Sequence, residues 1–224
     1  MSSGVWQALG RVPYRDALTI QEMIAAERAR GLRPDTLLLL EHPPTVTLGR
    51  RASASDLRRP GAELVHAGIA VEHVRRGGQA TYHGPGQLVG YPIVRLPRGG
   101  RGVRRFVAAL ESTLIDAVAA FGVAVERRPQ HPGAWVGDRK IASIGIEVRH
   151  GITRHGFALN VAMDLAPFSA IVPCGVPGLE MTDLSREAGT EIRVHEATAA
   201  VLQAWPRHLG TIEEERVHVV QGVG

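Results

Sequence analysis

The sequence predicts an α+β fold in which a mixed, largely antiparallel central sheet is flanked by helices. Helical periodicity occurs near both ends and in the middle of the chain, and a block of short β-prone segments separated by tight turns follows the middle helix. Strands and helices do not alternate regularly, which favours α+β over a parallel α/β sheet. The length of 224 residues suits a single domain covering residues 1–224.

The first half of the chain predicts a helix and two extended segments. Apolar residues recur at helical spacing over residues 14–30, and Gly31 is a plausible terminator. The segment Thr36–Leu48 begins with a continuous apolar run, is interrupted by Pro43-Pro44 and resumes as a β-prone stretch. This pattern indicates a buried strand, a bend and a second extended piece.

The second half predicts a long helix, a strand meander and a last helix. Residues 101–121 carry apolar side chains at i, i+3, i+4 and i+7 and stop at Gly122, and residues 194–209 have a similar pattern. Gly137-Asp138-Arg139 is typical of a hairpin turn, which would place Lys140 at a strand start. The four β-prone segments are Val123–Glu126, Ala134–Val136, Ile141–Val148 and His155–Val161.

The composition excludes several classes of protein. With 44% hydrophobic and 21% charged residues, the chain is neither disordered, collagenous nor membrane-embedded. The longest aliphatic run, Leu37 to Leu40, is far below the roughly 20 residues needed to span a bilayer. The opening Met1–Trp6 lacks the regions of a secretory signal, so we expect a cytoplasmic protein without membrane contact.

The charges and histidines give little support to a nucleic-acid or metal site. The net charge of +4 comes from scattered basic residues without interleaved aromatics, so we expect no nucleic-acid partner. An acidic protein partner and a merely solvated arginine-rich face both remain compatible with it. The histidines have no recognisable zinc spacing, and we expect neither a metal nor a cofactor.

Two residues are single examples of their kind. Cys174 is the only cysteine, so it cannot form an intrachain disulfide and is either an inert core residue or a reactive thiol. Lys140 is the only lysine among 26 lysines and arginines. A lysine that serves only as a solvated cation could be replaced by arginine without loss. A lysine that must lose its proton could not, because arginine stays charged. Survival of one lysine by chance is the alternative.

Three stretches depart from what a core requires. The first, Arg75–Gln87, contains four glycines within ten residues, together with the donors and aromatic ring of Arg76, Thr81, Tyr82 and His83. It could let a backbone pass close to a ligand, or it could be a glycine-rich hairpin. It lacks the ending of a phosphate loop and the strand-to-helix context of a dinucleotide fingerprint.

The second and third stretches hold the two single residues. Lys140–Gly145 and Gly156–Asn160 contain small residues that leave room for a ligand. In Ile171–Gly178, Cys174 stands between proline and glycine in an expected loop, where a thiol is open to attack and backbone N–H groups can face an oxyanion. An inert thiol is still compatible with this spacing alone.

Five motifs in order resemble the lipoyl(octanoyl) transferases of lipoate biosynthesis, and the resemblance covers roughly residues 35–190. They are Glu41-His42-Pro43-Pro44 with Thr47-Leu48-Gly49-Arg50, Arg76-Gly77-Gly78 through Thr81-Tyr82-His83-Gly84-Pro85-Gly86-Gln87, Lys140-Ile141-Ala142-Ser143-Ile144-Gly145, His155-Gly156-Phe157-Ala158-Leu159-Asn160, and Pro173-Cys174-Gly175. Several long motifs in one order are far more specific than any single glycine pattern.

The resemblance implies a fold similar to the lipoate and biotin protein ligases and a single octanoyltransferase catalytic domain. It implies transfer of an octanoyl group from octanoyl-acyl carrier protein to a lysine of lipoyl domains, those of 2-oxoacid dehydrogenase complexes and the glycine cleavage H protein. Cys174 would carry the acyl-enzyme thioester, with Lys140 beside it. The implied acyl-binding residues are Arg76, Gly77, Gly78, Gln79, Ala80, Thr81, Tyr82, His83, Ser143, Ile144, Gly145, Gly156, Phe157 and Ala158.

Physical chemistry is consistent with that pairing. An ammonium at Lys140 would stabilise a thiolate at Cys174, and once neutral it could act as general base toward the incoming lysine. Thioester exchange followed by aminolysis needs no ATP. The rival functions are an ATP-dependent lipoate or biotin-type ligase, a Cys-His hydrolase with His83 or His155 as base, and a non-enzymatic acyl- or carrier-binding module.

Overall fold

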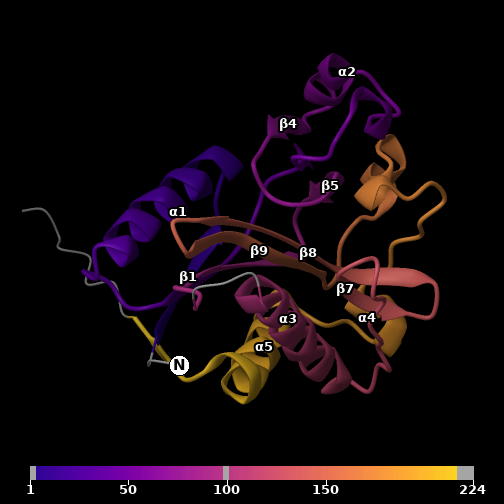
Figure 1. The fold of residues 1–224 in the computed structure, drawn as a ribbon. Helices are drawn as coiled ribbons and strands as arrows, with labels where there is room; N and C mark the ends of the chain where they lie inside the picture. The colour runs from indigo at the N-terminus through magenta and orange to yellow at the C-terminus, as the bar shows by residue number, and fades with distance from the viewer. Residues whose placement is uncertain (1–3, 98–100, 216–224) are drawn as a thin grey trace, which may run out of the picture.

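A seven-stranded sheet and a separate three-stranded sheet form the framework of the computed structural model, which describes residues 4–97 and 101–215 (Figure 1). The order is β10-β1-β2-β6-β9-β8-β7 in the central sheet and β4-β3-β5 in the small one. The strands are β1 (Gly4–Arg11), β2 (Thr36–Glu41), β3 (Thr45–Leu48), β4 (Ala70–His73), β5 (Ala80–His83), β6 (Gln87–Ile93), β7 (Gly133–Val136), β8 (Arg139–Arg149), β9 (Ile152–Asn160) and β10 (Ile212–Glu214).

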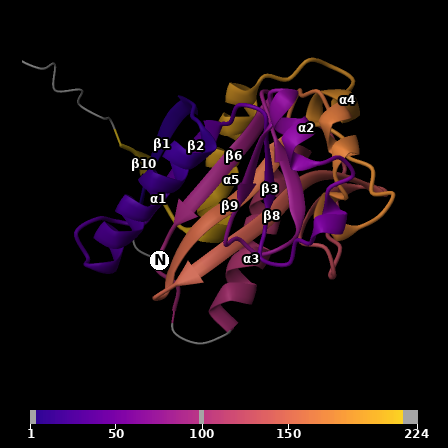
Figure 2. The same cartoon turned by 90° about the horizontal axis from the view of Figure 1, so that it is seen from above.

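Helices cover both faces of the central sheet. The helices are α1 (Tyr14–Ala29), α2 (Gly61–His66), α3 (Arg101–Ala119), α4 (Leu184–Ala188) and α5 (Val194–Leu209), and the 3-10 turns are η1 (Ala54–Asp56), η2 (Ala166–Ala170) and η3 (Pro173–Gly175). The pair α3 and α5 packs against one face, and α1 packs against the other (Figures 1 and 2). The sheet is therefore the middle layer of three.

The apolar run in β2 explains how one strand serves both layers. Successive side chains of a strand point to opposite faces. Leu37 and Leu39 join the core under α3 and α5, while Leu38 and Leu40 join the core under α1. A strand buried on both faces is uniformly apolar, which is why this segment shows no alternation.

The observed architecture confirms the α+β prediction, including the largely antiparallel sheet. In the central sheet the neighbouring pairs β2–β6, β6–β9, β9–β8 and β8–β7 are antiparallel. Strands β7, β8 and β9 form the predicted meander, with the turn between β7 and β8 at Gly137 and Asp138. The β1–β2 and β1–β10 pairs are parallel. The predicted strand at Val123–Glu126 is wrong, because only Glu126 pairs there, through an isolated bridge to Trp135.

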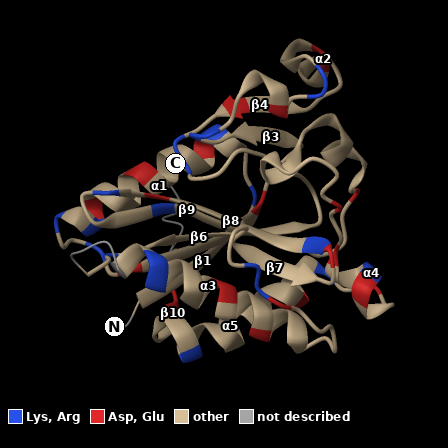
Figure 3. Ribbon diagram, turned by 45° about the vertical axis from the view of Figure 1, so that its right-hand side comes forward, with Lys and Arg blue, Asp and Glu red and all other residues tan. Residues whose placement is uncertain are grey.

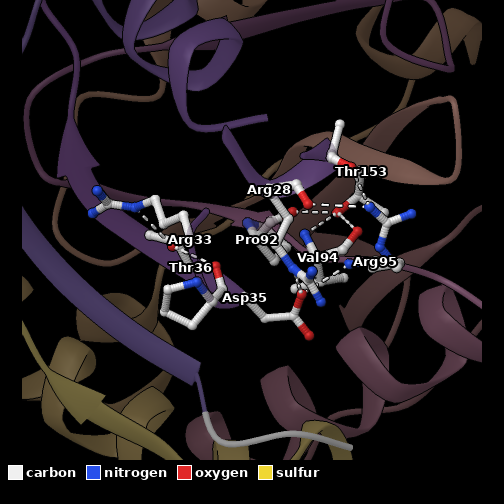
Figure 4. Close-up of polar contacts among 10 residues, drawn as sticks. Arg28, Arg33, Asp35, Thr36, Pro92, Val94, Arg95 and Thr153 are labelled. Atoms are coloured by element: carbon white, nitrogen blue, oxygen red, sulfur yellow. Dashed lines mark hydrogen bonds and ion pairs between the residues drawn. The ribbon is translucent and has the colours of Figure 1, made fainter. Parts of the chain in front are cut away.

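A polar cluster ties the end of α1 to the end of β6 (Figure 4). Asp35 accepts hydrogen bonds from the Arg28 side chain at 2.6 Å and from the backbone N–H of Arg95 at 2.9 Å. The Arg95 side chain in turn donates to the carbonyls of Arg28 and Ala29. These carbonyls are in the last turn of α1, where the helix offers them no partner of its own. The cluster therefore fixes the helix over the sheet.

The small sheet lies on the same side of the central sheet as the cavity lined by β8 and β9, and a third apolar cluster packs on it. Tyr82 of β5 and Phe168 of η2 meet edge to face within this cluster, with ring centroids 5.5 Å apart. The segment around η1 also pairs with the chain that follows η2, through a bridge between Leu57 and Ile171. The glycine-rich loop before β5 and the cysteine loop at η3 are thereby held on one side of the central sheet.

Charged residues are spread over the fold. Acidic and basic residues are interspersed along the elements (Figure 3). Of the helices in the described part of the chain, none is long and apolar enough to cross a bilayer.

Candidate active site

Cys174 lies at the tip of a rigid turn. Its backbone has φ 56° and ψ 14°, a left-handed conformation that is uncommon for a residue other than glycine. The turn is closed by hydrogen bonds from the Gly175 and Val176 N–H groups to the carbonyls of Val172 and Pro173. Val172 N–H also bonds to the Asp56 carbonyl at 2.8 Å, so the main chain of a neighbouring segment holds the turn in place. The thiol is half-buried.

Lys140 brings its ammonium to this thiol. It is the second residue of β8, and its backbone bonds to the Glu180 carbonyl and to the Thr182 N–H. Its side chain is only 2% exposed, and its Nζ lies 3.4 Å from Cys174 Sγ. The same Nζ lies 5.1 Å from the centre of the Trp135 ring, whose face attracts a cation.

The cysteine and lysine open onto a cavity of about 680 Å³ that includes its open mouth. The residues of the three predicted stretches meet around it, although they lie far apart in the sequence. Those that line the cavity are Arg76, Gly77, Gly78, Gln79, Ala80, Thr81, His83, Lys140, Ser143, Ile144, Gly145, Gly156, Phe157, Ala158 and Cys174. The cavity walls come from the glycine-rich loop, β8, β9 and η3.

Tyr82 is the one predicted acyl-site residue that is absent from the lining. Its ring packs on Phe168 in the core under the small sheet. A Cβ on Gly84 would lie 2.5 Å from the Tyr82 hydroxyl, so that glycine leaves room for the tyrosine. The position of Tyr82 indicates support of the strand that carries Thr81 and His83.

Arg76 holds the glycine-rich loop in shape. Its guanidinium donates to the Thr47 carbonyl at 2.7 Å, to the Thr47 hydroxyl at 2.8 Å and to the Gln79 carbonyl at 2.7 Å. Desolvation lowers the pKa of Arg76, and attraction to Tyr14 and Cys174 partly offsets this. It pairs with no carboxylate within the described residues. A buried cation therefore lies near the thiol, where a developing anion would benefit from it.

Glycines let this loop approach its neighbours. A Cβ on Gly49 would lie 2.5 Å from the Gly78 carbonyl oxygen, and one on Gly145 would lie 2.9 Å from the Gly77 carbonyl oxygen. Gly77 N–H also bonds to the Ile146 carbonyl at 2.9 Å. The glycines thus serve close packing of the loop between β3 and β8, in addition to leaving room for a ligand.

A cluster of buried histidines and tyrosines borders the inner end of the cavity. His42 bonds through one ring nitrogen to the Val12 carbonyl and through the other to the Tyr91 hydroxyl, both at 2.7 Å. His83 bonds to Gln87 at 2.7 Å. His155, with φ 58°, lies 3.3 Å from the Tyr14 hydroxyl. These side chains form a polar wall of a cavity whose other walls contain both polar and apolar residues.

Burial keeps this cluster uncharged. Desolvation lowers the pKa of His42 to about 4 and that of His155 to about 3, and Arg76 adds to the effect on His155. The pKa of His83 is also well below its usual value, mainly through desolvation and then through His42. Desolvation raises the pKa of Tyr14 to about 12. The histidines are therefore neutral at physiological pH and offer hydrogen bonds rather than charge.

Several lining residues had no signal in the sequence. They are Tyr14, Arg51, Tyr91, Gln130, His131 and Pro132. His155, which belongs to a family motif and is an alternative base by sequence, also lines the cavity. Tyr14 begins an ordinary amphipathic helix and Tyr91 lies within a buried strand, so neither stands out by pattern. In the part of the chain that the structure describes, no group of three His, Cys, Asp or Glu residues could hold a metal ion.

This arrangement can carry out nucleophilic chemistry. A half-buried thiol on a strained turn faces a cation, and a cavity with a backbone-rich wall adjoins it. No carboxylate or neutral histidine in the described chain is hydrogen-bonded to Cys174, whose side-chain partner is Lys140. The site thus differs from a Cys-His pair, in which the imidazole takes the thiol proton.

Comparisons with known proteins show the family and the fold of this chain. Residues 13–205 match the sequence model of the lipoyl protein ligase A/B catalytic domain family. An octanoyltransferase of Geobacter sulfurreducens is 49% identical over 193 residues, which cover 86% of this chain and 79% of the relative. Among solved structures, the bipartite lipoate protein ligase of Thermoplasma acidophilum has a TM-score of 0.74 at 16% identity, covering 96% of this chain and 87% of that one.

A more distant structure shows the same fold. The biotin protein ligase of Aquifex aeolicus has a TM-score of 0.51 at 10% identity and covers 93% of this chain and 69% of its own. At these identities the likeness concerns the fold alone. The expected similarity to lipoate and biotin protein ligases is confirmed.

Proposed function

This chain belongs to the family of the lipoyl protein ligase A/B catalytic domain and is an acyltransferase, and from that premise we propose how it works. It moves an octanoyl group from octanoyl-acyl carrier protein to a specific lysine of a lipoyl domain. The group passes through a thioester on Cys174. The observation that carries this proposal is the 3.4 Å contact between Lys140 Nζ and Cys174 Sγ in the wall of the cavity.

In the first half-reaction the thiolate of Cys174 attacks the carbonyl carbon of the donor thioester. The bond between that carbon and the carrier's sulfur breaks, and a thioester to Cys174 forms. Lys140 gives a proton to the departing carrier thiolate and is left as a neutral amine. Thiolates are the reactive form of cysteine, and the neighbouring ammonium favours that form.

In the second half-reaction the amine of the acceptor lysine attacks the acyl-enzyme. An amide forms, the carbon–sulfur bond to Cys174 breaks, and the thiolate is restored. The acceptor's ammonium has to lose two protons on the way to the amide. Neutral Lys140 takes one of them as general base, and the other goes to water. The thiolate and ammonium pair is thus regenerated for the next cycle.

The remaining residues hold the acyl group. The side chains of Ile144, Phe157 and Ala158 provide an apolar wall beside the thiol, and the glycines of the loop expose backbone to the acyl carbonyl. Exchange between two thioesters is close to balanced, and aminolysis of a thioester runs downhill. Neither step therefore needs ATP, which a ligase would use to activate a free acid. No cofactor is required.

The partners follow from the same proposal. The donor is an acyl carrier protein, and the acceptors are lipoyl domains of 2-oxoacid dehydrogenase complexes and the glycine cleavage H protein. The archaeal lipoate protein ligase that shares this fold is described as part of a lipoylation system with its E2 lipoyl domain, which fits an acceptor of that class. A cytoplasmic location is part of this proposal.

Intact-mass measurement tests the acyl-enzyme. Incubation with octanoyl-carrier should add one octanoyl group to the wild type and none to Cys174→Ala, and a lipoyl domain should then remove the adduct. Transfer from free octanoate plus ATP should be absent. An acylated acceptor without any adduct on the wild type would overturn the thioester route.

The role of Lys140 is tested separately by Lys140→Arg. This variant keeps a positive charge but cannot lose a proton at accessible pH. We expect transfer to fall at least about a hundredfold, within the range that loss of general acid–base catalysis causes. Full activity in Lys140→Arg would mean that only charge is needed beside the thiol.

A further inference from the structure

Four exposed arginines, Arg50, Arg51, Arg58 and Arg75, belong to the chain segments beside the catalytic cavity, and Arg51 lines it. Within the ranges that the structure describes, none of the four forms an ion pair with a carboxylate. Several other exposed arginines do so, as Arg139 does with Glu187. We call these four residues the arginine rim.

The backbone places the arginine rim directly beside the site. Arg50 N–H bonds to the Arg76 carbonyl at 3.0 Å, which brings Arg50 next to Arg75, and Arg51 N–H bonds to the Gly78 carbonyl at 3.1 Å. Arg58 N–H bonds to the Ala170 carbonyl at 2.9 Å, at the start of the chain that leads to the cysteine loop. The rim therefore spans from the glycine-rich loop to the cysteine loop.

No exposed carboxylate neutralises this rim from within its own segment. Asp56 is the one acidic residue between Gly49 and Pro60, and it is only 4% exposed. Its carboxylate accepts a hydrogen bond from the Ser53 N–H at 2.8 Å and so faces its own turn. Arg51 also lines the cavity itself. A molecule that enters the cavity on this side meets uncompensated positive charge.

We propose that the arginine rim is the docking surface for the acyl donor, an acidic carrier domain that presents its thioester on a phosphate-bearing arm. This inference rests on the proposed function, since it assigns a surface to one of its two substrates. Arginine is the residue best suited to phosphate and carboxylate groups. The position of Arg51 in the cavity lining matches an arm whose thioester end reaches Cys174 while its phosphate stays at the mouth.

Charge also decides between the two partners. The reacting group of the acceptor is a lysine, which is a cation until it loses its proton, and uncompensated arginines repel it. The donor's arm is an anion that the same arginines attract. Opposite charges on two docking faces raise association rates by about 10-fold to 1,000-fold at low ionic strength. The rim therefore favours donor encounter over acceptor encounter.

The experiment compares two donors on the same enzyme. The test variant is Arg50→Glu/Arg58→Glu/Arg75→Glu, which leaves the cavity lining untouched. The matched control, Arg30→Glu/Arg104→Glu/Arg105→Glu, reverses three charges on exposed residues of the α1 C-terminal cap and α3. The measured quantity is the second-order rate of Cys174 acylation by octanoyl-carrier and by octanoyl-pantetheine, which lacks both carrier and phosphate.

We expect the test variant to lose at least about tenfold in acylation by octanoyl-carrier at low salt, with a weaker salt dependence than the wild type. Acylation by octanoyl-pantetheine should stay within about twofold, and so should transfer from the preformed acyl-enzyme to a lipoyl domain. The control should resemble the wild type with both donors. The neutral variant Arg50→Gln/Arg58→Gln/Arg75→Gln should show a smaller loss of the same kind.

Other results would overturn the inference in distinguishable ways. Unchanged acylation by the carrier would mean that the rim does not bind it, and a loss confined to the acceptor step would assign the rim to the lipoyl domain. Equal losses in the test and control variants would indicate net charge alone. Equal losses of acylation rate with both donors, in the Glu and the Gln variant alike, would indicate that these arginines support the shape of the cavity and do not bind the carrier. Failure of the wild type with both donors would refute the proposed function itself.

Discussion

The buried histidines predict that this protein loses stability steeply between pH 7 and pH 5. His42 and His155 are 0% and 3% exposed, and their pKa values are lowered to about 4 and about 3. In the unfolded chain the histidine pKa is about 6.5. Below that pH the unfolded state binds more protons than the folded state, so the free energy of unfolding falls as the pH falls.

The size of this loss of stability follows from how far the pH lies below the histidine pKa of the unfolded chain. At pH 5 an unfolded histidine is about 1.5 pH units below its pKa, while His42 and His155 remain neutral in the fold. Each unit corresponds to about 1.4 kcal/mol, so each of the two contributes a loss of about 2 kcal/mol, and together about 4 kcal/mol. His83 acts in the same direction. Domains of this size have a total stability of about 5–15 kcal/mol, so the loss is a large share of it.

Urea unfolding followed by circular dichroism at pH 7.5, 6.5, 5.5 and 5.0 measures this slope. Carboxylates whose pKa is lowered, such as Asp116 and Glu187, lose their contribution only as the pH falls below about 4, outside the window. In His42→Gln the slope between pH 6 and pH 5 should be smaller by about 1 kcal/mol per pH unit. At pH 7.5 the same variant should be less stable by about 1–3 kcal/mol, because the bonds to Val12 and Tyr91 are lost.

The matched control is His195→Gln, which makes the same substitution at an exposed position of α5. The slope separates protonation from packing, because a purely structural loss shifts the stability equally at every pH. The reasoning is refuted by a slope in His42→Gln that equals that of the wild type. A wild-type stability that is flat between pH 7.5 and pH 5 would refute it as well.

Two further predictions concern backbone space and the lysine. Gly86→Ala should lower the free energy of unfolding by more than about 3 kcal/mol, because its Cβ would lie 2.0 Å from a backbone oxygen, whereas Gly68→Ala, also at positive φ but in open space, should cost only about 1 kcal/mol. Urea unfolding measures both, and equal losses would contradict the steric argument. Trp135→Leu removes the ring under the Lys140 ammonium and should slow acylation from octanoyl-pantetheine by about 3-fold to 30-fold, corresponding to about 0.5–2 kcal/mol. A time course of intact mass measures it, and an unchanged rate would show that the ring does not position the lysine.

Local patterns predicted the long helices closely, since their signal is contained in the segment itself. Residues 14–30, 101–121 and 194–209 were expected, and the helices run over Tyr14–Ala29, Arg101–Ala119 and Val194–Leu209. Short strands at the edges were missed. β4 has four residues, of which none is buried, and β10 has three, so neither carries a hydrophobic pattern. Their pairing to β3 and β1 comes from distant parts of the chain.

The candidate site was predictable as three stretches but not as an arrangement. The glycine-rich loop, the start of β8 and the cysteine loop each stood out by composition, and the family resemblance joined them. The partner of Cys174 is 34 residues away in the sequence, and a bridge to Met181 and the Asp56–Val172 bond fix the approach. Such long-range contacts leave no periodic signal. Tyr14 and Tyr91 could not be identified for the same reason.

The surroundings of Lys140 suit a lysine better than an arginine. Two buried cations stand near the thiol, Arg76 and Lys140, and their surroundings differ. Arg76 donates hydrogen bonds to the carbonyls of Gly77, Thr47 and Gln79 and to the Thr47 hydroxyl. A planar guanidinium with several N–H groups can make all of these bonds at once. Lys140 Nζ has a sulfur at 3.4 Å and the face of a ring, and no oxygen acceptor within the described chain.

An arginine in place of Lys140 would bury several N–H groups without acceptors, each at a cost of about 1–3 kcal/mol. The proposed mechanism needs an amine that changes its protonation state during the cycle, which a lysine can do and an arginine cannot. We therefore propose different roles for the two cations: Arg76 shapes the loop through its bonds to carbonyls, and Lys140 exchanges protons with the substrates of the thiol.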